Sequence, residues 1–314
     1  MNKTQIKEKT GQTIFTVAAT ICVIAVAAIF VFMLIKSIPA FNKIGLFDFI
    51  FGETWAPDRL DNYETSNLSG SYGIFKMIVG TLATTVGALL IGGTLGYFTA
   101  VFLAFYCPKK LKKIFSSMVN LLAGIPSVVY GFFGIVFLLP LLANFAPNDG
   151  SGLLATSLIL GIMIMPTVVS LSKTSLEAVP RSYYEGALAL GSTHSQAVFG
   201  TVTKAAKSGV TASLVLGIGR ALGETMAVVM VAGNSVAYPE SLFNSFRVLT
   251  ANIVLEMGYA GEVQQGALVA TGVILLVFVL IVNLVFGAIS KKAIKGAVEG
   301  KGIFSKIFKR NEKT

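Results

Sequence analysis

Two oppositely charged residues, Arg220 and Glu224, stand inside an otherwise apolar stretch, residues 209–233. On a continuous helix they would share one face, with a rise of about 6 Å between them. At membrane depth an unpaired charge costs at least ~2.5–3.5 kcal/mol, so we expect the two groups to neutralise each other or to face water. The pair is therefore either a structural salt bridge or part of a polar pathway.

We favour the pathway, because arginine before glutamate is the weaker order for a stabilising pair on a helix. A guanidinium can hold two oxygens of an oxyanion at once, so Arg220 would line the route of an anion. Glu224 would keep Arg220 oriented and limit how tightly the anion binds. Gly219 and Gly223 form a G-x-x-x-G pattern in the same stretch, and Gly92 and Gly96 form another, from which we expect close helix packing.

Residues 173–208 form the longest internal polar connection, and they read as two short helices. The first covers residues 182–190 and is stopped by Gly191, and the second covers about 195–207. The first helix carries more apolar side chains than a linker needs. It would either dock into a groove on a soluble partner or lie on the membrane or on its own bundle, and the residues alone leave both open.

The elements that must position these residues are transmembrane helices. Of the 314 residues, 54% are hydrophobic and 13% are charged, against roughly 25% charged in an average soluble domain. This composition excludes an ordinary soluble enzyme, a disordered chain and a disulfide-rich secreted module. Six regions are long enough to cross a bilayer, and they predict an all-α integral membrane protein with six transmembrane helices: 14–35, 72–106, 114–145, 153–172, 209–233 and 263–289. The third region begins with a surface helix led by Lys109, Lys110, Lys112 and Lys113.

The distribution of charge predicts the orientation. If the chain starts in the cytoplasm, the cytoplasmic segments hold 19 Lys and Arg residues and the outer loops hold 4. This asymmetry is a strong positive-inside signal and places both termini in the cytoplasm. The basic tail, residues 291–314, is expected to lie against lipid headgroups rather than to bind nucleic acid.

Several kinds of chemistry have no sequence support. The chain has no G-x-x-x-x-G-K-[ST] loop for nucleotide phosphates, a single histidine (His194) and no clustered Cys and His ligands. We therefore predict no catalytic residues, no metal and no cofactor, and we expect any ATP hydrolysis on another subunit. An ATP-independent channel or proton-coupled carrier remains as an alternative, although Glu224 is the only carboxylate within the predicted spans.

The sequence resembles the permeases of binding-protein-dependent ABC importers. Glu185-Gly186-Ala187 followed by Gly191 is similar to the EAA loop of that family. The segments 123–131 and 219–227 are similar to phosphate importer permeases. Trp55-Ala56-Pro57 with Tyr72-Gly73 is similar to the PstC-type subunit rather than to its PstA-type partner.

The resemblance implies a type I ABC importer permease architecture and a role in phosphate import. It implies a heterodimer with a second homologous permease, two cytoplasmic ATPase subunits and an extracytoplasmic phosphate-binding protein. Arg220 and Glu224 would take the substrate pathway role. Glu185, Gly186, Ala187 and Gly191 would take the ATPase coupling role. Another oxyanion, such as molybdate or sulfate, is the alternative substrate.

The expected organisation follows from these assignments: a cytoplasmic N-terminus (1–13), a first transmembrane helix (14–35), an extracytoplasmic loop (36–71), a five-helix permease core (72–290) with the coupling loop 173–208, and the tail 291–314. The outer loops carry a net charge of −5, which would repel free phosphate unless a docked binding protein delivers it. Five acidic residues of the first outer loop would contact that protein or would be simply solvated: Asp48, Glu53, Asp58, Asp61 and Glu64.

Overall fold

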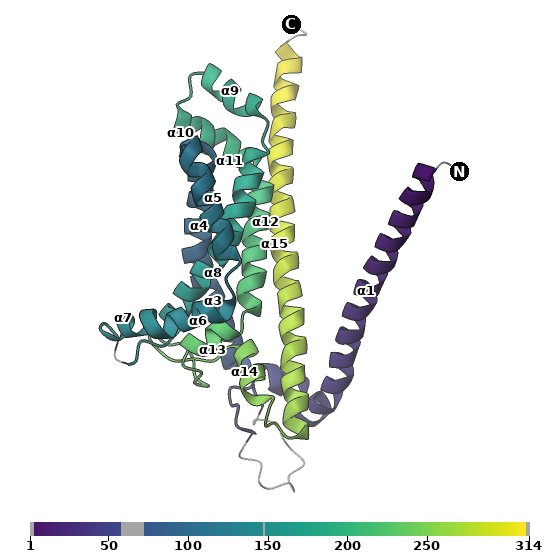
Figure 1. Cartoon of the computed structure of the whole chain (residues 1–314), viewed down its shortest axis with the longest axis vertical. Coiled ribbons are helices and arrows are strands. Elements are labelled where there is room, and N and C mark those ends of the chain that lie inside the picture. The colour runs from purple at the N-terminus through teal and green to yellow at the C-terminus, as the bar shows by residue number, and fades with distance from the viewer. Residues whose placement is uncertain (1–2, 58–71, 147, 312–314) are drawn as a thin grey trace. The chain divides into compact units, whose positions relative to one another are not determined.

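The computed structural model describes residues 3–57, 72–146 and 148–311, and these residues fold almost entirely into helices (Figure 1). Within these ranges there is no β-strand, only two isolated β-bridges, Trp55–Tyr72 and Gly233–Phe246. The prediction of an all-α protein is confirmed. Asp58, Asp61 and Glu64, proposed above as outer-loop contacts, lie outside the described residues.

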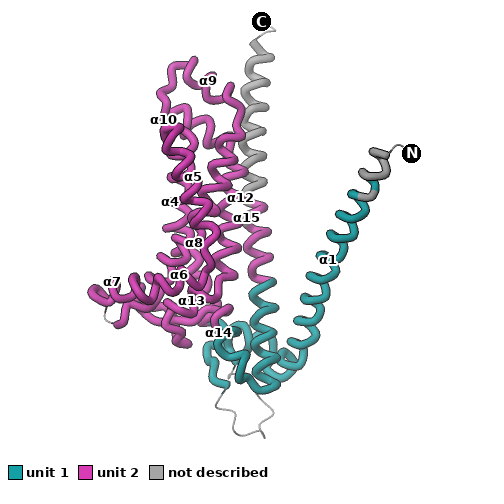
Figure 2. The backbone as a smooth tube through the Cα atoms, in the orientation of Figure 1, with its two compact units in different colours: residues 1–75, 252–276 teal, residues 76–251, 277–314 magenta. Residues whose placement is uncertain are grey.

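The chain forms two compact units, coloured separately in Figure 2. Unit 1 contains Met1–Phe75 and Asn252–Leu276, and unit 2 contains Lys76–Ala251 and Val277–Thr314. The long last helix therefore contributes its first part to unit 1 and the remainder to unit 2. The predicted site residues all belong to unit 2.

Unit 1 is built on a long first helix, α1 (Lys3–Ile44), followed by α2 (Leu46–Phe51). The apolar sequence ends at residue 35, but the helix continues to Ile44 and stops at Gly45, whose φ of +86° other residues rarely adopt. The predicted loop 36–71 is thus helical in its first part. Parts of α14 (Leu249–Glu256) and α15 (Glu262–Asn311) complete the unit.

A buried carboxylate organises the end of unit 1. Glu256 is 6% exposed, and its Oε2 accepts hydrogen bonds from Trp55 Nε1 and Gln264 Nε2, each at 2.8 Å. The Trp55 ring also meets the Tyr72 ring edge-to-face at 5.4 Å. Trp55 is therefore a packed residue of the folded unit.

Unit 2 holds the remaining helices. The second apolar region is one curved span with two π-helical turns: α3 (Phe75–Ala88), η2 (Leu89–Gly93), α4 (Thr94–Val101) and η3 (Phe102–Tyr106). The third region comprises α5 (Lys109–Ala123), α6 (Ser127–Phe133), η4 (Gly134–Leu138) and α7 (Leu139–Ala143). The later elements are α8 (Leu153–Glu177), α9 (Arg181–Ala189), α10 (His194–Gln196), η5 (Ala197–Val202), α11 (Thr203–Ala205), α12 (Lys207–Gly223) and α13 (Met226–Val231).

Helix α8 is the core of unit 2. It packs against α12, the η2–α4 part of the second span, and α5. Its apolar residues on several sides are buried, among them Ile159, Ile164 and Val168. Ser172 of α8 and Ser213 of α12 share a buried hydrogen bond of 2.7 Å, which satisfies both hydroxyls in an apolar interior.

Within the described ranges, four helices are long and apolar enough to cross a membrane: Gly11–Ile44, Phe75–Tyr106, Leu153–Glu177 and Glu262–Val285. The third predicted region is not straight. Lys109–Ala123 and Ser127–Ala143 meet at 95°, because Gly124-Ile125-Pro126 interrupts the helix. The prediction of a continuous fifth span over 209–233 is wrong, since α12 ends at Gly223. Six crossings and cytoplasmic termini remain predictions.

Candidate functional site

Arg220 stands near the end of α12 and lines a cavity of about 740 Å³ within unit 2. Its Nη1 lies 3.4 Å from Thr167 Oγ1 of α8, a long hydrogen bond. The side chain is half-buried. The other residues around the cavity come from α12 and α15: Ala212, Val215, Leu216, Gly219, Asn283 and Gly287.

Glu224 occupies the break between two helices. Its φ and ψ, −71° and 134°, are those of extended backbone, and α13 begins two residues later. The Glu224 carboxylate accepts a hydrogen bond from Ala227 N at 3.3 Å, so it caps the first turn of α13. Its carbonyl accepts from Thr250 Oγ1 at 2.8 Å, which satisfies a group that the interrupted helix leaves free.

The expected pairing of Arg220 with Glu224 on one helix face is therefore wrong. Glu224 lies outside α12, beside Thr81 and Thr84 in a second, small cavity. Among the described residues Arg220 has no carboxylate partner within ion-pairing distance. The salt-bridge alternative fails on this geometry, and the pathway role of Arg220 stays a prediction.

The two G-x-x-x-G patterns have different surroundings. A Cβ on Gly92 would collide with the backbone of Gly161, and one on Gly96 would lie 2.9 Å from Val168 Cβ. These two glycines confirm the expected close packing. A Cβ added to Gly219 or Gly223 would meet no atom within 4 Å, so that expectation is wrong for them within this chain.

The predicted coupling residues lie on and just after α9. Both loop helices are present, and their bounds, Arg181–Ala189 and 194–205, agree with the prediction to within a few residues. No residue of α9 is buried, Glu185 and Gly186 are exposed, and the following Leu190 is 90% exposed. The face of α9 that carries Glu185 and Gly186 is therefore exposed and accessible to a partner.

The spacing of Ala187 and Gly191 has a structural explanation. Gly191 has φ +84°, its N–H donates to Leu188 O at 2.9 Å, and the Ser192 N–H donates to Ala187 O at 3.1 Å. These two bonds form a Schellman motif, which closes the helix end and requires a left-handed residue at the glycine position. The predicted glycine C-cap is confirmed.

An aromatic cluster that the sequence reading missed holds α9 against the second span; we call it the histidine clasp. It consists of Phe105, Tyr106, Tyr184 and His194. Tyr184 Oη lies 2.7 Å from His194 Nδ1, and the His194 ring meets Tyr106 edge-to-face at 4.7 Å. Tyr184 also stacks on Phe105 at 6.4 Å, and Tyr106 Oη shares a 3.1 Å bond with Ser195 Oγ. The only signal in the sequence was that His194 is the single histidine.

Thr167 was also missed, because a threonine in the middle of α8 carries no signal of its own in the sequence. Its role appears only when α8 and α12 are packed together.

No group of three or more His, Cys, Asp or Glu side chains able to hold a metal ion occurs in the described ranges. Arg220 and the exposed face of α9 are therefore the features on which a function can be argued.

Residues 92–295 match the family model described as "Binding-protein-dependent transport system inner membrane component". The probable ABC transporter permease protein YqgH of Bacillus subtilis is 36% identical over 89% of this chain and 91% of its own length. The phosphate transport system permease protein PstC of Pasteurella multocida is 33% identical over 81% of this chain and 85% of its own.

Solved structures agree on the fold. An inward-facing structure of the MetNI methionine ABC transporter matches with a TM-score of 0.56 at 18% identity, over 70% of this chain and 97% of that one. A bacterial ABC transporter for alginate matches with a TM-score of 0.52 at 16% identity, over 69% and 78%. The chain therefore belongs to the binding-protein-dependent transport system inner membrane component family, and it is a multi-pass membrane permease subunit of an ABC importer, not a catalytic one.

Proposed function

We propose that this permease carries inorganic phosphate into the cell and that Arg220 lines the route. The observation that carries the proposal is the Arg220 guanidinium, which faces a cavity of about 740 Å³ and has no carboxylate partner among the described residues. A planar guanidinium can donate two parallel hydrogen bonds to an oxyanion. Thr167 and Asn283, which also line the cavity, could supply further polar contacts.

Phosphate is favoured over other anions by the names of relatives. Permeases named for phosphate transport in Pasteurella multocida and Mesorhizobium japonicum are 33% and 32% identical to this chain over most of its length. The relative from Bacillus subtilis is named only as a probable ABC permease. Glu224 supports the route indirectly, because it caps α13 and leaves the Arg220 charge available to the anion.

The same proposal assigns partners. A second homologous permease completes the membrane part, an extracytoplasmic binding protein delivers phosphate, and two cytoplasmic ATPase subunits supply energy. Glu185, Gly186, Ala187 and Gly191 would form the contact with an ATPase. The support is that α9 exposes its surface while the Schellman motif keeps its end fixed.

The test of the pathway is phosphate uptake by Arg220→Ala in cells whose own copy is deleted. We expect uptake to fall at least about 100-fold while the chain still reaches the membrane, because a charge-assisted bidentate contact is lost. Arg220→Lys keeps the charge but not the planar fork and should retain a measurable part of the activity. Normal uptake by Arg220→Ala would overturn the assignment.

A permease for sulfate or molybdate is the second candidate, because a guanidinium binds these tetrahedral oxyanions by the same geometry. Uptake of labelled phosphate should be unaffected by a tenfold excess of either anion. Strong competition by one of them would transfer the substrate assignment to that anion.

The coupling role is tested with two glycines that have equal space around them. Gly186 lies on α9 and Gly200 on η5, both are exposed, and neither has an atom within 4 Å of an added Cβ. Gly186→Trp should prevent the ATPase from co-purifying, whereas Gly200→Trp should not. Equal recovery of the ATPase with both variants would contradict the assignment of α9.

A further inference from the structure

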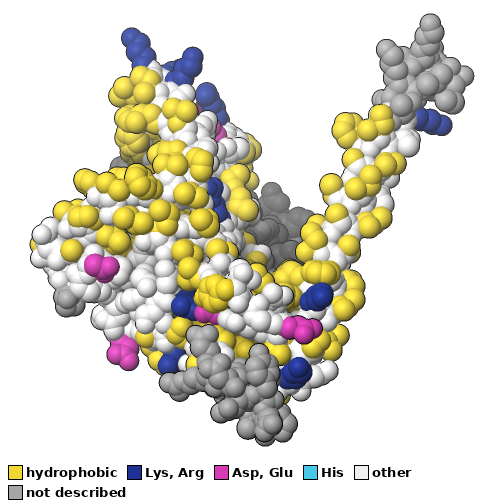
Figure 3. Space-filling view, turned by 60° about the horizontal axis from the view of Figure 1, so that its bottom comes forward, with side chains coloured by type: hydrophobic (Ala, Val, Ile, Leu, Met, Phe, Trp, Pro, Cys, Tyr) yellow, Lys and Arg dark blue, Asp and Glu magenta, His cyan; other side chains and the backbone are white. Residues whose placement is uncertain are grey.

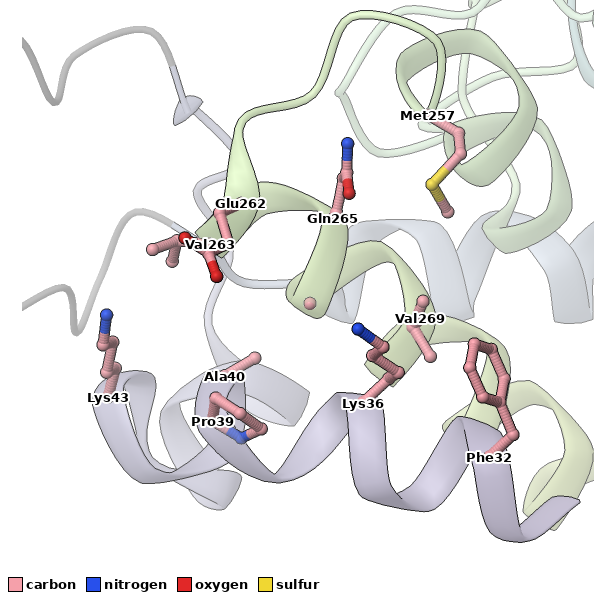
Figure 4. Close-up of a pocket in the computed structure, with 11 residues that line it drawn as sticks. Phe32, Lys36, Pro39, Ala40, Lys43, Met257, Glu262, Val263, Gln265 and Val269 are labelled. Atoms are coloured by element: carbon pink, nitrogen blue, oxygen red, sulfur yellow. The ribbon is translucent and has the colours of Figure 1, made fainter.

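Unit 1 contains a cavity of about 470 Å³ that the transport proposal does not use (Figure 4). It lies between the last turns of α1 and the first turns of α15. In Figure 4, Lys36 and Lys43 extend from α1 on the side where α15 lies, and Glu262 points back toward α1. The volume is within the range of small-molecule sites. The rest of the lining is Phe32, Pro39, Ala40, Met257, Val263, Gln265, Gly266 and Val269.

The two lysines are placed to act together. They are seven residues apart, two helical turns or about 10 Å of rise, so both occupy the face of α1 that carries Pro39 and Ala40. Neither lysine has a carboxylate within ion-pairing distance in the described part of the chain. The cavity thus presents two ammonium groups that form no ion pair with a described carboxylate.

Other polar groups of the cavity do not cancel this charge. Gln265 Nε2 already donates to Ala260 O at 2.9 Å. Among the described residues of the lining Glu262 is the only carboxylate, so these residues carry a net charge of +1. Lys36 and Lys43 are also two of the four basic residues that the charge analysis places in the outer segments. Because basic residues are scarce in the outer segments, composition alone would not lead us to expect two of them in one cavity.

The cavity lies where the apolar part of α1 gives way to its charged end. The uncharged stretch of α1 ends at Ile35, immediately before Lys36. Phe32, Ile35 and Ile38 are 58%, 60% and 52% exposed, and Figure 3 shows apolar side chains along α1 with charged ones where the helix ends. A transmembrane helix with this pattern meets the headgroup layer at its first lysines. One end of the cavity is cationic, and the end near Phe32 and Val269 is apolar.

Helices α15 and α1 lie near each other beside the cavity. A Cβ on Gly266 would lie 3.4 Å from Ala40 Cβ and 3.6 Å from Lys36 O, so α15 and α1 approach closely there. A ligand must therefore enter from the open side, where the lysine side chains and the apolar surface of α1 are exposed. An amphipathic molecule oriented along α1 would satisfy both ends at once.

We propose that this cavity binds the headgroup of an anionic phospholipid of the phosphatidylglycerol class. The phosphodiester pairs with Lys36 and Lys43, and the first methylene groups of the acyl chains lie on Phe32 and Val269. Free phosphate would share the lysine contacts but would leave the apolar end uncovered. A zwitterionic headgroup would place its ammonium near the lysines unless it turned toward Glu262, so the net charge favours the anionic lipid.

The test is native mass spectrometry of the full-length chain, purified together with the subunits that accompany it and titrated with phosphatidylglycerol. Lys36→Glu/Lys43→Glu should weaken retention of one lipid roughly 30-fold or more, the effect of two lysines at an anionic surface. Lys9→Glu, on the same helix at its other end, is the matched control and should retain the lipid. If that control loses the lipid equally, general surface attraction explains the binding and the proposal fails.

Two further measurements distinguish an anionic phospholipid from a zwitterionic one and from free phosphate. Phosphatidylethanolamine should bind at least about tenfold more weakly than phosphatidylglycerol, and millimolar inorganic phosphate should not displace the bound lipid. Equal binding of both lipids, or displacement by phosphate, would overturn the assignment. If the double glutamate variant fails to assemble, Lys36→Gln/Lys43→Gln removes the charges without reversing them, and unchanged binding by that variant would also refute the proposal.

Discussion

The second span and α12 contain the same G-x-x-x-G spacing, but the two glycine pairs meet opposite surroundings. Gly92 and Gly96 face α8 so closely that added methyl groups would meet Gly161 or Val168. Gly219 and Gly223 face open space within the described chain. Small residues at this spacing therefore create a smooth helix face, and only the tertiary structure decides whether another helix covers it.

The difference follows from what each helix does in unit 2. The second span packs on α8, the most buried of the four candidate spans, where close backbone approach gives dispersion contacts along the pair. Gly219 instead lines the cavity of Arg220, next to the residue that carries the proposed function. Gly92 and Gly96 allow two helices to pack closely, whereas Gly219 leaves space in the cavity beside Arg220.

The largest effect is expected for Gly92→Ala. The new Cβ would lie 2.7 Å from Gly161 C and 2.8 Å from its Cα, and backbone atoms cannot move aside as a side chain can. We expect the free energy of unfolding to fall by about 3 kcal/mol, the upper end for over-packing. Chemical denaturation of the purified chain in detergent would measure it. A change below about 0.5 kcal/mol would break the distinction between the two glycine pairs.

Gly96→Ala should cost less, about 1–2 kcal/mol, because its Cβ would meet Val168 Cβ at 2.9 Å and Cγ1 at 3.0 Å, whereas the conflict at Gly92 is with backbone atoms. The same denaturation experiment applies. Val168→Ala removes Cγ1 but keeps Cβ, so combining it with Gly96→Ala should recover the part of the loss that Cγ1 causes, which a double-mutant cycle would detect as coupling. Strictly additive losses would indicate that Val168 Cγ1 is not the atom in conflict.

Gly219→Ala should change stability in the opposite direction. The position is inside α12 and open, so alanine should raise the free energy of unfolding by roughly 0.5–1 kcal/mol through helix propensity alone. Phosphate uptake should be retained, since one methyl group takes little of a cavity of about 740 Å³. Loss of uptake at unchanged stability would contradict this and place a partner helix on the open face.

The smallest effect is expected at Asp149, whose side chain forms hydrogen bonds within the loop before α8. Asp149 Oδ1 accepts from Ser151 Oγ at 2.6 Å and from Ser151 N at 3.1 Å, and these bonds lower the pKa of Asp149 below its usual value. Because the pKa of Asp149 is lower in the folded chain than in the unfolded chain, the ionised carboxylate stabilises the fold. This stabilisation is fully present at a pH above the unfolded-state pKa, near 4, and is lost as the pH falls through the folded-state pKa. Asp149→Asn should therefore destabilise slightly at pH 7, and the difference should shrink as the pH falls through the folded-state pKa.

The packing variants serve as the control for that pH dependence. The loss caused by Gly92→Ala should be the same at pH 7 and pH 4, because no titratable group takes part in the contact with Gly161. An Asp149→Asn effect that has the same size at every pH would show that the loss does not come from the carboxylate charge.

Much of the fold follows from residue type and spacing. The uncharged run 14–35 predicts a helix because no other structure satisfies the backbone in lipid. The two loop helices and the end at Gly191 were also predicted correctly, since a left-handed residue after an apolar helix is a local signal. These features depend on neighbours in the sequence, so they can be read without knowing the fold.

The break at Glu224 could not be read in this way. Hydropathy is insensitive to backbone direction, and the extended residue is held by Thr250, which is 26 residues away in the sequence. The 95° bend after Ala123 has a local signal in Gly124-Ile125-Pro126, but the sequence does not give the size of the bend. The Arg220 cavity needs α8, α12 and α15 together, and such long-range packing is absent from any local pattern.

The histidine clasp has a mechanical consequence. Residues 178–180 connect α9 to α8 along the chain, but the rings of Tyr184, His194 and Tyr106 join α9 to the end of the second span directly. A force applied to α9 can therefore reach the second span by two routes, one along the covalent chain and one through edge-to-face rings and the Tyr184–His194 hydrogen bond. Because the ring route bypasses residues 178–180, we expect a tilt of α9 to reach the end of the second span with less loss in that connection.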